Sequence, residues 1–312
     1  MKKFRIYFII FLIVSCNKIE FPLAEEFGKF DWSLYPGDPA TYSSTYYNIS
    51  NPEENWTLNN NTKGILLEYY TGHTCVNCPD AGSNAKRLDT TFSNVIMTSI
   101  HAGPSGYYQI PNPPIFANDY QTAAGNEYVN ESGEMPGMFA NPLGTVNRKT
   151  DSISNTVWYP QTQWENKINE EILDSTLNIN IQSQSHIFTQ TNGLYIHNKS
   201  SILNNISGNF HLVIYLVRDV VISPQKMPDG STNLDYEHLY VLSDNINGTW
   251  GKEIVNGTAE KDSIIYNNFT YQLIDPNTDS TYNPYNLSLI SYVINRNNMK
   301  IIQVIKTKPN VH

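Results

Sequence analysis

The 312-residue sequence predicts two folded parts, an α/β domain followed by an all-β antiparallel sandwich domain. Two observations predict this order. Residues 64–100 read as strand, helix and strand, which is the pattern of a βαβ unit. From Leu177 onward, apolar and polar residues alternate in short runs rich in β-branched side chains.

The N-terminus, residues 1–15, predicts a lipoprotein signal peptide. MKKFR precedes an apolar stretch from Ile6 to Val14, which is too short to span a bilayer. The stretch closes with the lipobox IVSC, so we expect cleavage before Cys16 and lipid on its sulfur. An ordinary secretory peptide with a chance cysteine is the alternative. No later stretch reaches the roughly 20 apolar residues of a spanning helix, so anchoring would depend on the lipid.

Residues 16–58 predict a lipid-anchored tether. Pro and Gly are frequent among Ser, Asn and Tyr, and this density argues against a helix. The aromatic residues of the segment indicate that part of it packs onto the folded body; they are Phe21, Phe27, Phe30, Trp32 and Tyr35. The chain has a net charge of -9, and loss of the signal peptide makes it more negative, because residues 1–15 contain Lys2, Lys3 and Arg5 but no acidic residue. We therefore expect no nucleic acid as a partner.

The first folded domain is expected over residues 59–175. GILLEYY at 64–70 and NVIMTSI at 94–100 have the length and composition of buried strands in a parallel sheet. Between them, apolar residues recur at helical spacing from Cys78 to Phe92, with Pro79 in the first turn. A further helix, with Trp158, Trp164 and residues 168–173 at helical spacing, would close the domain.

The stretch TGHTCVNCPD places Cys75 and Cys78 between the first strand and the helix. A Cys-x-x-Cys motif beside a βαβ unit is typical of a thioredoxin-like redox domain. An exported protein can keep the pair as a disulfide. The helix N-terminus would favour the thiolate of Cys75, and Cys78 would resolve a mixed disulfide. An inert, structural disulfide is the alternative.

Two neighbouring residues are candidates for tuning the pair. Glu68, in the apolar strand, could carry protons if it is buried near the cysteines, or be a solvated strand residue. His73 would stabilise the Cys75 thiolate if it were a cation, or be an ordinary loop histidine.

Metal sites fit the pattern poorly. Zinc commonly takes two Cys pairs, and no second pair exists. Covalent haem would require a histidine where Pro79 stands. A Cu(I) site with Cys75, Cys78 and His101 remains open, since thiolates suit soft ions. We predict no metal and no cofactor.

The second folded domain is expected over residues 176–312 as an antiparallel β-sandwich. Turn signals such as Asn192-Gly193 and Asn247-Gly248 separate its strands. Asp275, Asn277 and Asp279 space oxygens as a calcium loop does, but Asn286 stands where the bidentate Glu belongs, so we predict a polar hairpin. The expected strands are LNINIQ, GLYIHN, FHLVIYLVRDVVI, EHLYVL, SIIYNNFTYQLI, LSLISYVIN and KIIQVIK.

Five motifs resemble a Bacteroidota lipoprotein family named for a twenty-eight-kilodalton outer-membrane protein. They are LLEYYTGHTCVNCPD, SIHAG at 99–103, NPLGTVNR at 141–148, YEHLYVL, and GTWG at 248–251. The resemblance implies an outer-membrane, lipid-anchored protein with a thioredoxin-like domain and a β-rich C-terminal domain, facing the periplasm or the cell surface. It also implies a cis proline facing the cysteines, for which Pro142 is the candidate and Pro136 the competitor.

The stretch between the second strand and this proline is longer than such a fold needs. We expect a helix over residues 115–128. The proline-rich segment 104–114 is expected to be a loop near the site or a cap of the sheet.

The expected function is thiol-disulfide exchange with the thiols or disulfides of exported proteins. The alternative is a surface or periplasmic binding protein, adhesin-like, in which Cys75 and Cys78 are a structural disulfide and the β domain binds a surface ligand. Fold alone does not choose between them.

Overall fold

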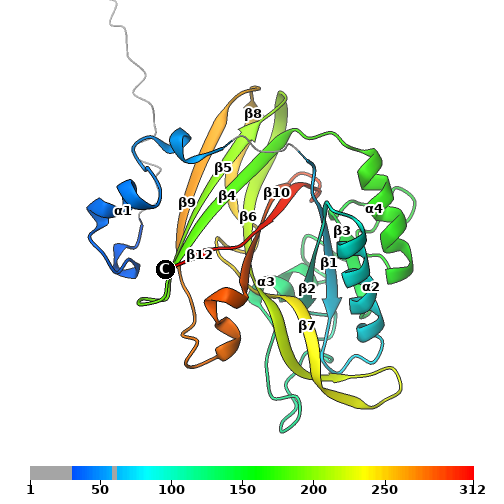
Figure 1. The fold of residues 1–312 in the computed structure, drawn as a ribbon. Helices are drawn as coiled ribbons and strands as arrows, with labels where there is room; N and C mark the ends of the chain where they lie inside the picture. The colour runs from blue at the N-terminus through cyan, green and yellow to red at the C-terminus, as the bar shows by residue number, and fades with distance from the viewer. Residues whose placement is uncertain (1–29, 58–61) are drawn as a thin grey trace, which may run out of the picture.

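The computed structural model describes residues 30–57 and 62–312. Over these residues the protein is mostly β, with an eight-stranded and a four-stranded sheet (Figure 1). Both sheets are mixed, because each contains a parallel strand pair. The cleavage site at Cys16 lies outside the described residues. Within the described residues, no helix is both long and apolar enough to cross a membrane.

The strands are β1 (Ile65–Thr71), β2 (Val95–His101), β3 (Leu143–Val146), β4 (Ile179–Phe188), β5 (Gly193–Ile202), β6 (Ile206–Lys226), β7 (Thr232–Asn245), β8 (Lys252–Ala259), β9 (Ile264–Gln272), β10 (Leu287–Asn295), β11 (Ile301–Thr307) and β12 (Asn310–Val311). The α-helices are α1 (Pro39–Thr45), α2 (Cys78–Thr91), α3 (Ala123–Tyr128) and α4 (Trp164–Leu173). Short 3-10 helices cover Trp32–Leu34, Pro52–Asn55, Gln161–Gln163, Ser280–Tyr282 and Pro284–Asn286.

The predicted βαβ unit is confirmed. β1 and β2 pair in parallel from Ile65 opposite Val95 to Thr71 opposite His101, and α2 connects them. Every residue of β1 is buried, as expected for a strand covered on both faces. One face packs against α2 and α4, and the other against α3 and the strands of the C-terminal half. The cysteine motif lies at the open end of this unit.

The eight-stranded sheet crosses the predicted domain boundary near residue 175. Its order is β11-β10-β6-β7-β2-β1-β3, with β8 paired to β6. β7 meets β2 in parallel, with Ser99 opposite Val241. This contact arises because β6 and β7 are long enough to extend past the second sheet, which places β7 alongside β2 (Figure 1). The two predicted parts therefore share one sheet.

The second sheet, in the order β12-β4-β5-β9, packs against the other end of the shared sheet through a common apolar core. Its outer face is covered by residues 30–57 (Figure 1). Phe30, Trp32 and Tyr35 pack against Phe188 and Tyr195, which confirms the predicted packing for these three residues. Phe21 and Phe27 lie outside the described residues.

Helix α1 in this N-terminal segment was not expected from the Pro and Gly content. Pro39 stands at its start, where a missing N–H costs nothing, and the Asp38 side chain accepts from the Ala40 N–H. The capping residues at its start therefore allow a short helix in a segment whose Pro and Gly content argues against one.

The prediction of a helix over residues 115–128 is wrong for the first half of that range. α3 begins only at Ala123, where the Thr122 side chain caps it by accepting from the Gly125 N–H. Before it, Asn112 and Phe116 form an isolated β-bridge.

Strand β8 was not predicted from the sequence, because Asn256 and Gly257 interrupt the apolar alternation of KEIVNGTA.

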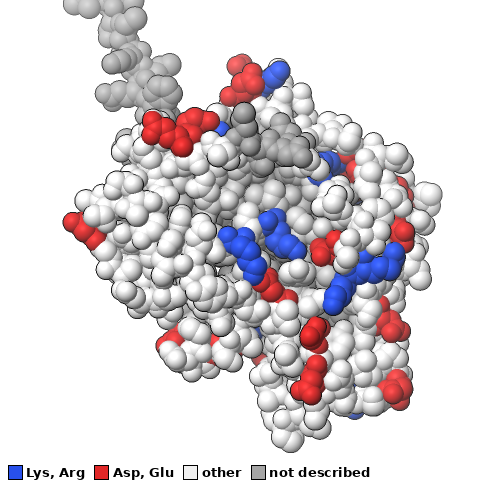
Figure 2. All heavy atoms as spheres, in the orientation of Figure 1, with Lys and Arg blue, Asp and Glu red and all other residues white. Residues whose placement is uncertain are grey.

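Basic and acidic side chains lie next to one another on the face shown in Figure 2. Ion pairs of this kind also join the two halves of the chain. Glu171 of α4, whose side chain is 0% exposed, lies 3.3 Å from Lys300 Nζ in the β10–β11 turn and 3.4 Å from Lys63 Nζ. Burial alone would raise the pKa of Glu171, but the Asn147 hydrogen bond and these cations lower it.

Candidate functional site

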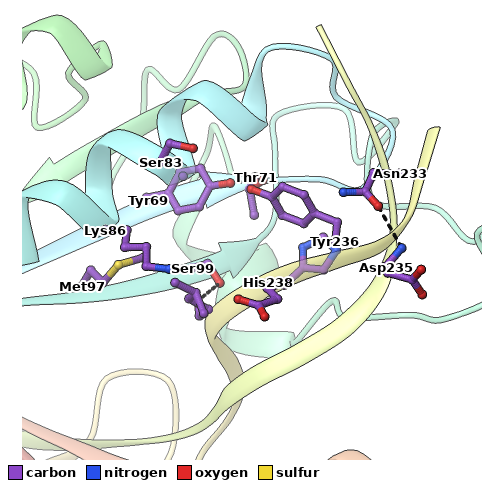
Figure 3. Close-up of a pocket in the computed structure, with 13 residues that line it drawn as sticks. Tyr69, Thr71, Ser83, Lys86, Met97, Ser99, Asn233, Asp235, Tyr236 and His238 are labelled. Carbon is purple, nitrogen blue, oxygen red and sulfur yellow. Dashed lines mark hydrogen bonds between the residues drawn. The ribbon is translucent and has the colours of Figure 1, made fainter. Parts of the chain in front are cut away.

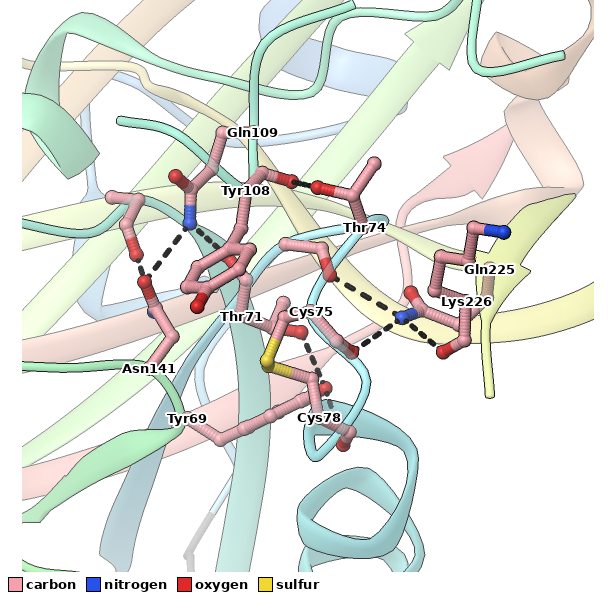
Figure 4. Close-up of a disulfide and its surroundings, with 12 residues drawn as sticks. Tyr69, Thr71, Thr74, Cys75, Cys78, Tyr108, Gln109, Asn141, Gln225 and Lys226 are labelled. Carbon is pink, nitrogen blue, oxygen red and sulfur yellow. Dashed lines mark hydrogen bonds between the residues drawn. A yellow bond between two sulfur atoms is a disulfide. The ribbon is translucent and has the colours of Figure 1, made fainter. Parts of the chain in front are cut away.

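Cys75 and Cys78 form a disulfide at the C-terminal end of β1 (Figure 4). Cys78 is the first residue of α2, and Pro79 follows it. The Cys75 N–H donates to the Gly72 carbonyl at 3.0 Å, and the Cys78 N–H donates to the Cys75 carbonyl at 3.2 Å. These bonds turn the chain from the strand into the helix within a few residues.

Both cysteines are buried, with exposed fractions of 2% for Cys75 and 0% for Cys78. Part of the cover is the segment 104–114, whose Tyr108 lies beside the disulfide in Figure 4. The Tyr108 carbonyl accepts from Thr74 N–H at 3.3 Å and from Thr74 Oγ1 at 3.2 Å. A Cβ on Gly72 would lie 2.5 Å from the same oxygen, so the close approach requires glycine. The segment is therefore a loop at the site, as expected.

The Asn141-Pro142 peptide bond is cis, as the resemblance predicts for Pro142, whereas the bond before Pro136 is trans. Asn141 is tied to the same loop. Its Oδ1 accepts from Gln109 Nε2 at 3.2 Å, and that nitrogen also donates to the Thr71 carbonyl at 2.7 Å. Gln109 thus links the end of β1 to the segment that carries Pro142.

The β6–β7 hairpin reaches the cysteine loop from the C-terminal half. Gln225 Nε2 donates to the Cys75 carbonyl at 3.0 Å and lies 3.3 Å from the Gly72 carbonyl. The Lys226 N–H donates to the His73 carbonyl at 2.8 Å. Sequence reasoning missed these residues, because no signal separates a polar residue that bridges two domains from any other polar residue in a strand.

An open groove lies next to the disulfide. Its volume is about 600 Å³, and Thr74, Val76, Tyr107, Ile110, Pro111, Asn112, Phe116, Lys226 and Gly230 line it. Three of these side chains are large, apolar and well exposed: Val76 at 40%, Tyr107 at 70% and Ile110 at 54%. Clustered exposed apolar side chains mark binding surfaces more often than isolated ones do.

Three histidines lie beneath the cysteine loop. The His101 ring is 6.5 Å from the His73 ring and 5.4 Å from the His238 ring. Burial lowers the pKa of His73, so at pH 7 its imidazole is neutral and supplies no cation for a Cys75 thiolate. Burial also lowers the pKa of His101 well below its ordinary value. Neither His101 nitrogen has a hydrogen-bond partner among the described residues.

The part of the chain that the structure describes contains no group of three His, Cys, Asp or Glu side chains able to hold a metal ion. The Cu(I) alternative with Cys75, Cys78 and His101 therefore gains no support from it.

Glu68 lies in the middle of β1, and its side chain is 0% exposed. Its carboxylate accepts from Arg148 Nε at 2.7 Å, Arg148 Nη2 at 2.6 Å, Tyr215 Oη at 2.7 Å and Thr145 Oγ1 at 2.8 Å. Burial alone would raise the pKa of Glu68, but the Arg148 charge and these hydrogen bonds outweigh it and lower the pKa.

The Glu68 side chain lies on the opposite face of β1 from Tyr69, because successive strand residues alternate. Tyr69 faces α2, and its hydroxyl lies within hydrogen-bond distance of Thr71 Oγ1, at 2.7 Å, and of the Cys78 carbonyl, at 3.2 Å. Proton transfer from Glu68 to the cysteines stays a prediction, and the contacts of its carboxylate are those of a structural ion pair.

A smaller polar pocket lies between α2 and β7 (Figure 3). Its volume is about 320 Å³, and Tyr69, Thr71, Lys86, Ser99, Tyr236 and His238 are among its lining residues. His238 is buried, and its Nε2 has no hydrogen-bond partner among the described residues. Tyr69, which lines this pocket, also contacts the Cys78 carbonyl through its hydroxyl.

The family model "Outer membrane protein Omp28" matches residues 133–312, which is more than half of the chain. The chain belongs to the Omp28 family. This confirms the expected localisation, the outer membrane. The match contains NPLGTVNR, YEHLYVL and GTWG, whereas the cysteine motif and SIHAG precede it. Family membership therefore rests on the C-terminal half.

Two solved structures from Porphyromonas gingivalis are similar to the chain. HBP35 is 15% identical, with a TM-score of 0.56 over 81% of this chain and 77% of that chain, and so shares the fold. A domain of the outer membrane lipoprotein Omp28 is 23% identical, with a TM-score of 0.30 over 44% of this chain and 91% of that chain. No curated protein matches the chain.

Proposed function

We propose that this Omp28-family protein is a lipid-anchored, thioredoxin-like thiol-disulfide exchanger that acts on exported polypeptides through Cys75 and Cys78. The observation that carries the proposal is the position of the disulfide. It lies at the N-terminus of α2, directly after a buried parallel strand and beside an apolar groove. A helix N-terminus favours the thiolate of a cysteine placed there.

The exchange conserves electrons without another reactant. A thiolate of the client polypeptide attacks Cys75 Sγ, the bond between Cys75 and Cys78 breaks, and Cys78 leaves as a thiolate. A second client thiolate then attacks the mixed disulfide and releases Cys75. The client loses two electrons and the pair gains them. The reverse sequence reduces a client disulfide, with Cys75 attacking and Cys78 resolving.

The groove beside the pair supplies a docking place for the client. Val76, Tyr107 and Ile110 offer apolar contact, and Lys226 offers a cation that has no acidic partner among the described residues. Since Cys75 is buried, the segments around it have to move before a docked client reaches the sulfur. Anchoring through lipid on Cys16 is part of the proposal.

The burial of both cysteines favours a second candidate, a binding protein in which the disulfide is structural. A redox-active cysteine is usually partly exposed, and neither Cys75 nor Cys78 is. In that case the β half would carry the binding function and the pair would only hold the loop.

Trapping separates the two candidates. Cys78→Ser cannot resolve a mixed disulfide, so in cells it should accumulate adducts with exported proteins that thiol reductants release. Cys75→Ser is the matched control and should give few. Adducts absent from both variants, with both proteins folded, would support the structural disulfide.

A further inference from the structure

Two buried glutamines of the C-terminal half hold opposite ends of β1. Gln303 of β11 binds before its start, where Oε1 accepts from the Gly64 N–H at 2.8 Å and Nε2 donates to the Thr62 carbonyl at 3.1 Å. Gln225 binds beyond its end, at the cysteine loop (Figure 4). Each of the two glutamines is 1% exposed.

Gln225 gathers three carbonyl oxygens with one amide nitrogen. Its Nε2 has two hydrogens and donates to the Cys75 and Lys226 carbonyls, both at 3.0 Å, while the Gly72 carbonyl at 3.3 Å shares one of these hydrogens. The adjacent Lys226 N–H bonds the His73 carbonyl, so two consecutive hairpin residues hold the backbone of Gly72, His73 and Cys75. The Gly72 and Cys75 carbonyls also accept from the Cys75 and Cys78 N–H groups, which lie within the loop itself. Gln225 and Lys226 therefore add the bonds that fasten this loop to the β6–β7 hairpin.

We propose that Gln225 is a positioning residue for the exchange reaction at Cys75 and Cys78. The inference rests on the proposed function and adds that the C-terminal half completes the redox site. Gln225 touches the Cys75 backbone and not the sulfur, so it acts by holding the loop. The loop keeps the same path when the sulfurs separate, so the two thiols stay close to each other after reduction.

Holding the dithiol in place favours the disulfide, because closing the bond then removes little remaining freedom. Without Gln225 the reduced loop gains freedom that the oxidised loop lacks. The equilibrium shifts toward the dithiol, and the pair becomes a stronger oxidant. Gln303 contacts no residue of the cysteine loop, so its loss should weaken the fold without this shift.

The test measures the redox equilibrium of the pair against glutathione in the full mature chain with Cys16→Ser, which leaves Cys75 and Cys78 as its only thiols. Gln225→Met keeps the length of the side chain and removes both amide donors, and Gln225→Ala is the second variant. Gln303→Met is the matched control. We expect the Gln225 variants to lower the equilibrium constant for the disulfide about tenfold, a rise in potential of about 30 mV. Gln303→Met should keep the wild-type potential and lower only the denaturation midpoint.

A folded Gln225→Met protein with the wild-type potential would overturn the inference. So would Gln303→Met shifting the potential as far as Gln225→Met, because the effect would then be general loosening. Failure of the proposed function looks different: Cys78→Ser traps no client, whatever the Gln225 variants do to the potential.

Discussion

The middle of β1 and the loop after it come from one continuous motif, yet they are built in different ways. At the middle, Glu68 is held by an arginine, a tyrosine and a threonine, all buried. After the C-terminal end of β1, Gln225 and Lys226 hold the cysteine loop by donating to its backbone carbonyls, beside an open groove. The comparison indicates that the middle of β1 stabilises the joint between the two halves, and the loop after β1 is where we propose the exchange reaction.

The largest expected loss of stability follows from a change at the middle of β1. Arg148→Met leaves the Glu68 carboxylate buried and unpaired, which should lower the free energy of unfolding by about 3–5 kcal/mol. Urea denaturation measures it. Arg87→Ala is the control, because it breaks the exposed Arg87–Glu165 pair, with side chains 49% and 48% exposed, and should cost under about 1 kcal/mol. An equally small loss for Arg148→Met would contradict the structural role of this ion pair.

The two regions should also lose stability in different pH windows. Near the end, burial lowers the pKa of His238 from 6.5 to about 4, so between these values the unfolded chain binds more protons than the folded one. The contribution of His238 to stability should therefore fall by about 3 kcal/mol as pH drops through this window. At the middle, Glu68 has its pKa lowered from 4.5, so its contribution is lost only below that pH.

His238→Gln separates the two windows. The imidazole of His238 faces His101, Tyr120 and Tyr236, and the Arg218 charge also acts on it. The variant should reduce the loss between pH 6.5 and 4 by the His238 contribution of about 3 kcal/mol, when the free energy of unfolding in urea is followed with pH. A smaller loss stays in this window, because burial also lowers the pKa of His73, His101, His186 and His197. The loss below pH 4.5 should stay in place. An unchanged slope above pH 4.5 would remove His238 from the account.

The smallest expected loss of stability is at the disulfide itself. Replacing both Cys75 and Cys78 by Ala should cost only about 2 kcal/mol, because the bond closes a loop with a sequence separation of 3. The same urea measurement applies. A loss larger than that of Arg148→Met would reverse the comparison and favour a structural disulfide.

Local features of this fold could be predicted from the sequence, because they depend on neighbours in the chain. The apolar run before Thr71 predicts β1, and the spacing of Ala81, Ala85 and Leu88 predicts the buried face of α2. The cis bond before Pro142 followed from resemblance to a family.

Features set by distant partners could not be predicted. Whether β7 adds to β2 or closes its own sheet depends on how far the strand extends past the sandwich, and the alternation pattern is the same in both cases. Glu68 is ambiguous in sequence, since only the folded chain brings Arg148 and Tyr215 to it. The same holds for Gln225, one polar residue among several in a 21-residue strand.

The most direct test of exchange at the cysteine pair is the reduction potential of Cys75 and Cys78 in the wild-type mature chain carrying only Cys16→Ser. The pair is equilibrated with glutathione, and its thiols are trapped and counted by mass shift. We expect a value between about -100 and -280 mV, the range of catalytic couples. A value below about -300 mV is that of a structural disulfide and would contradict the proposed exchange.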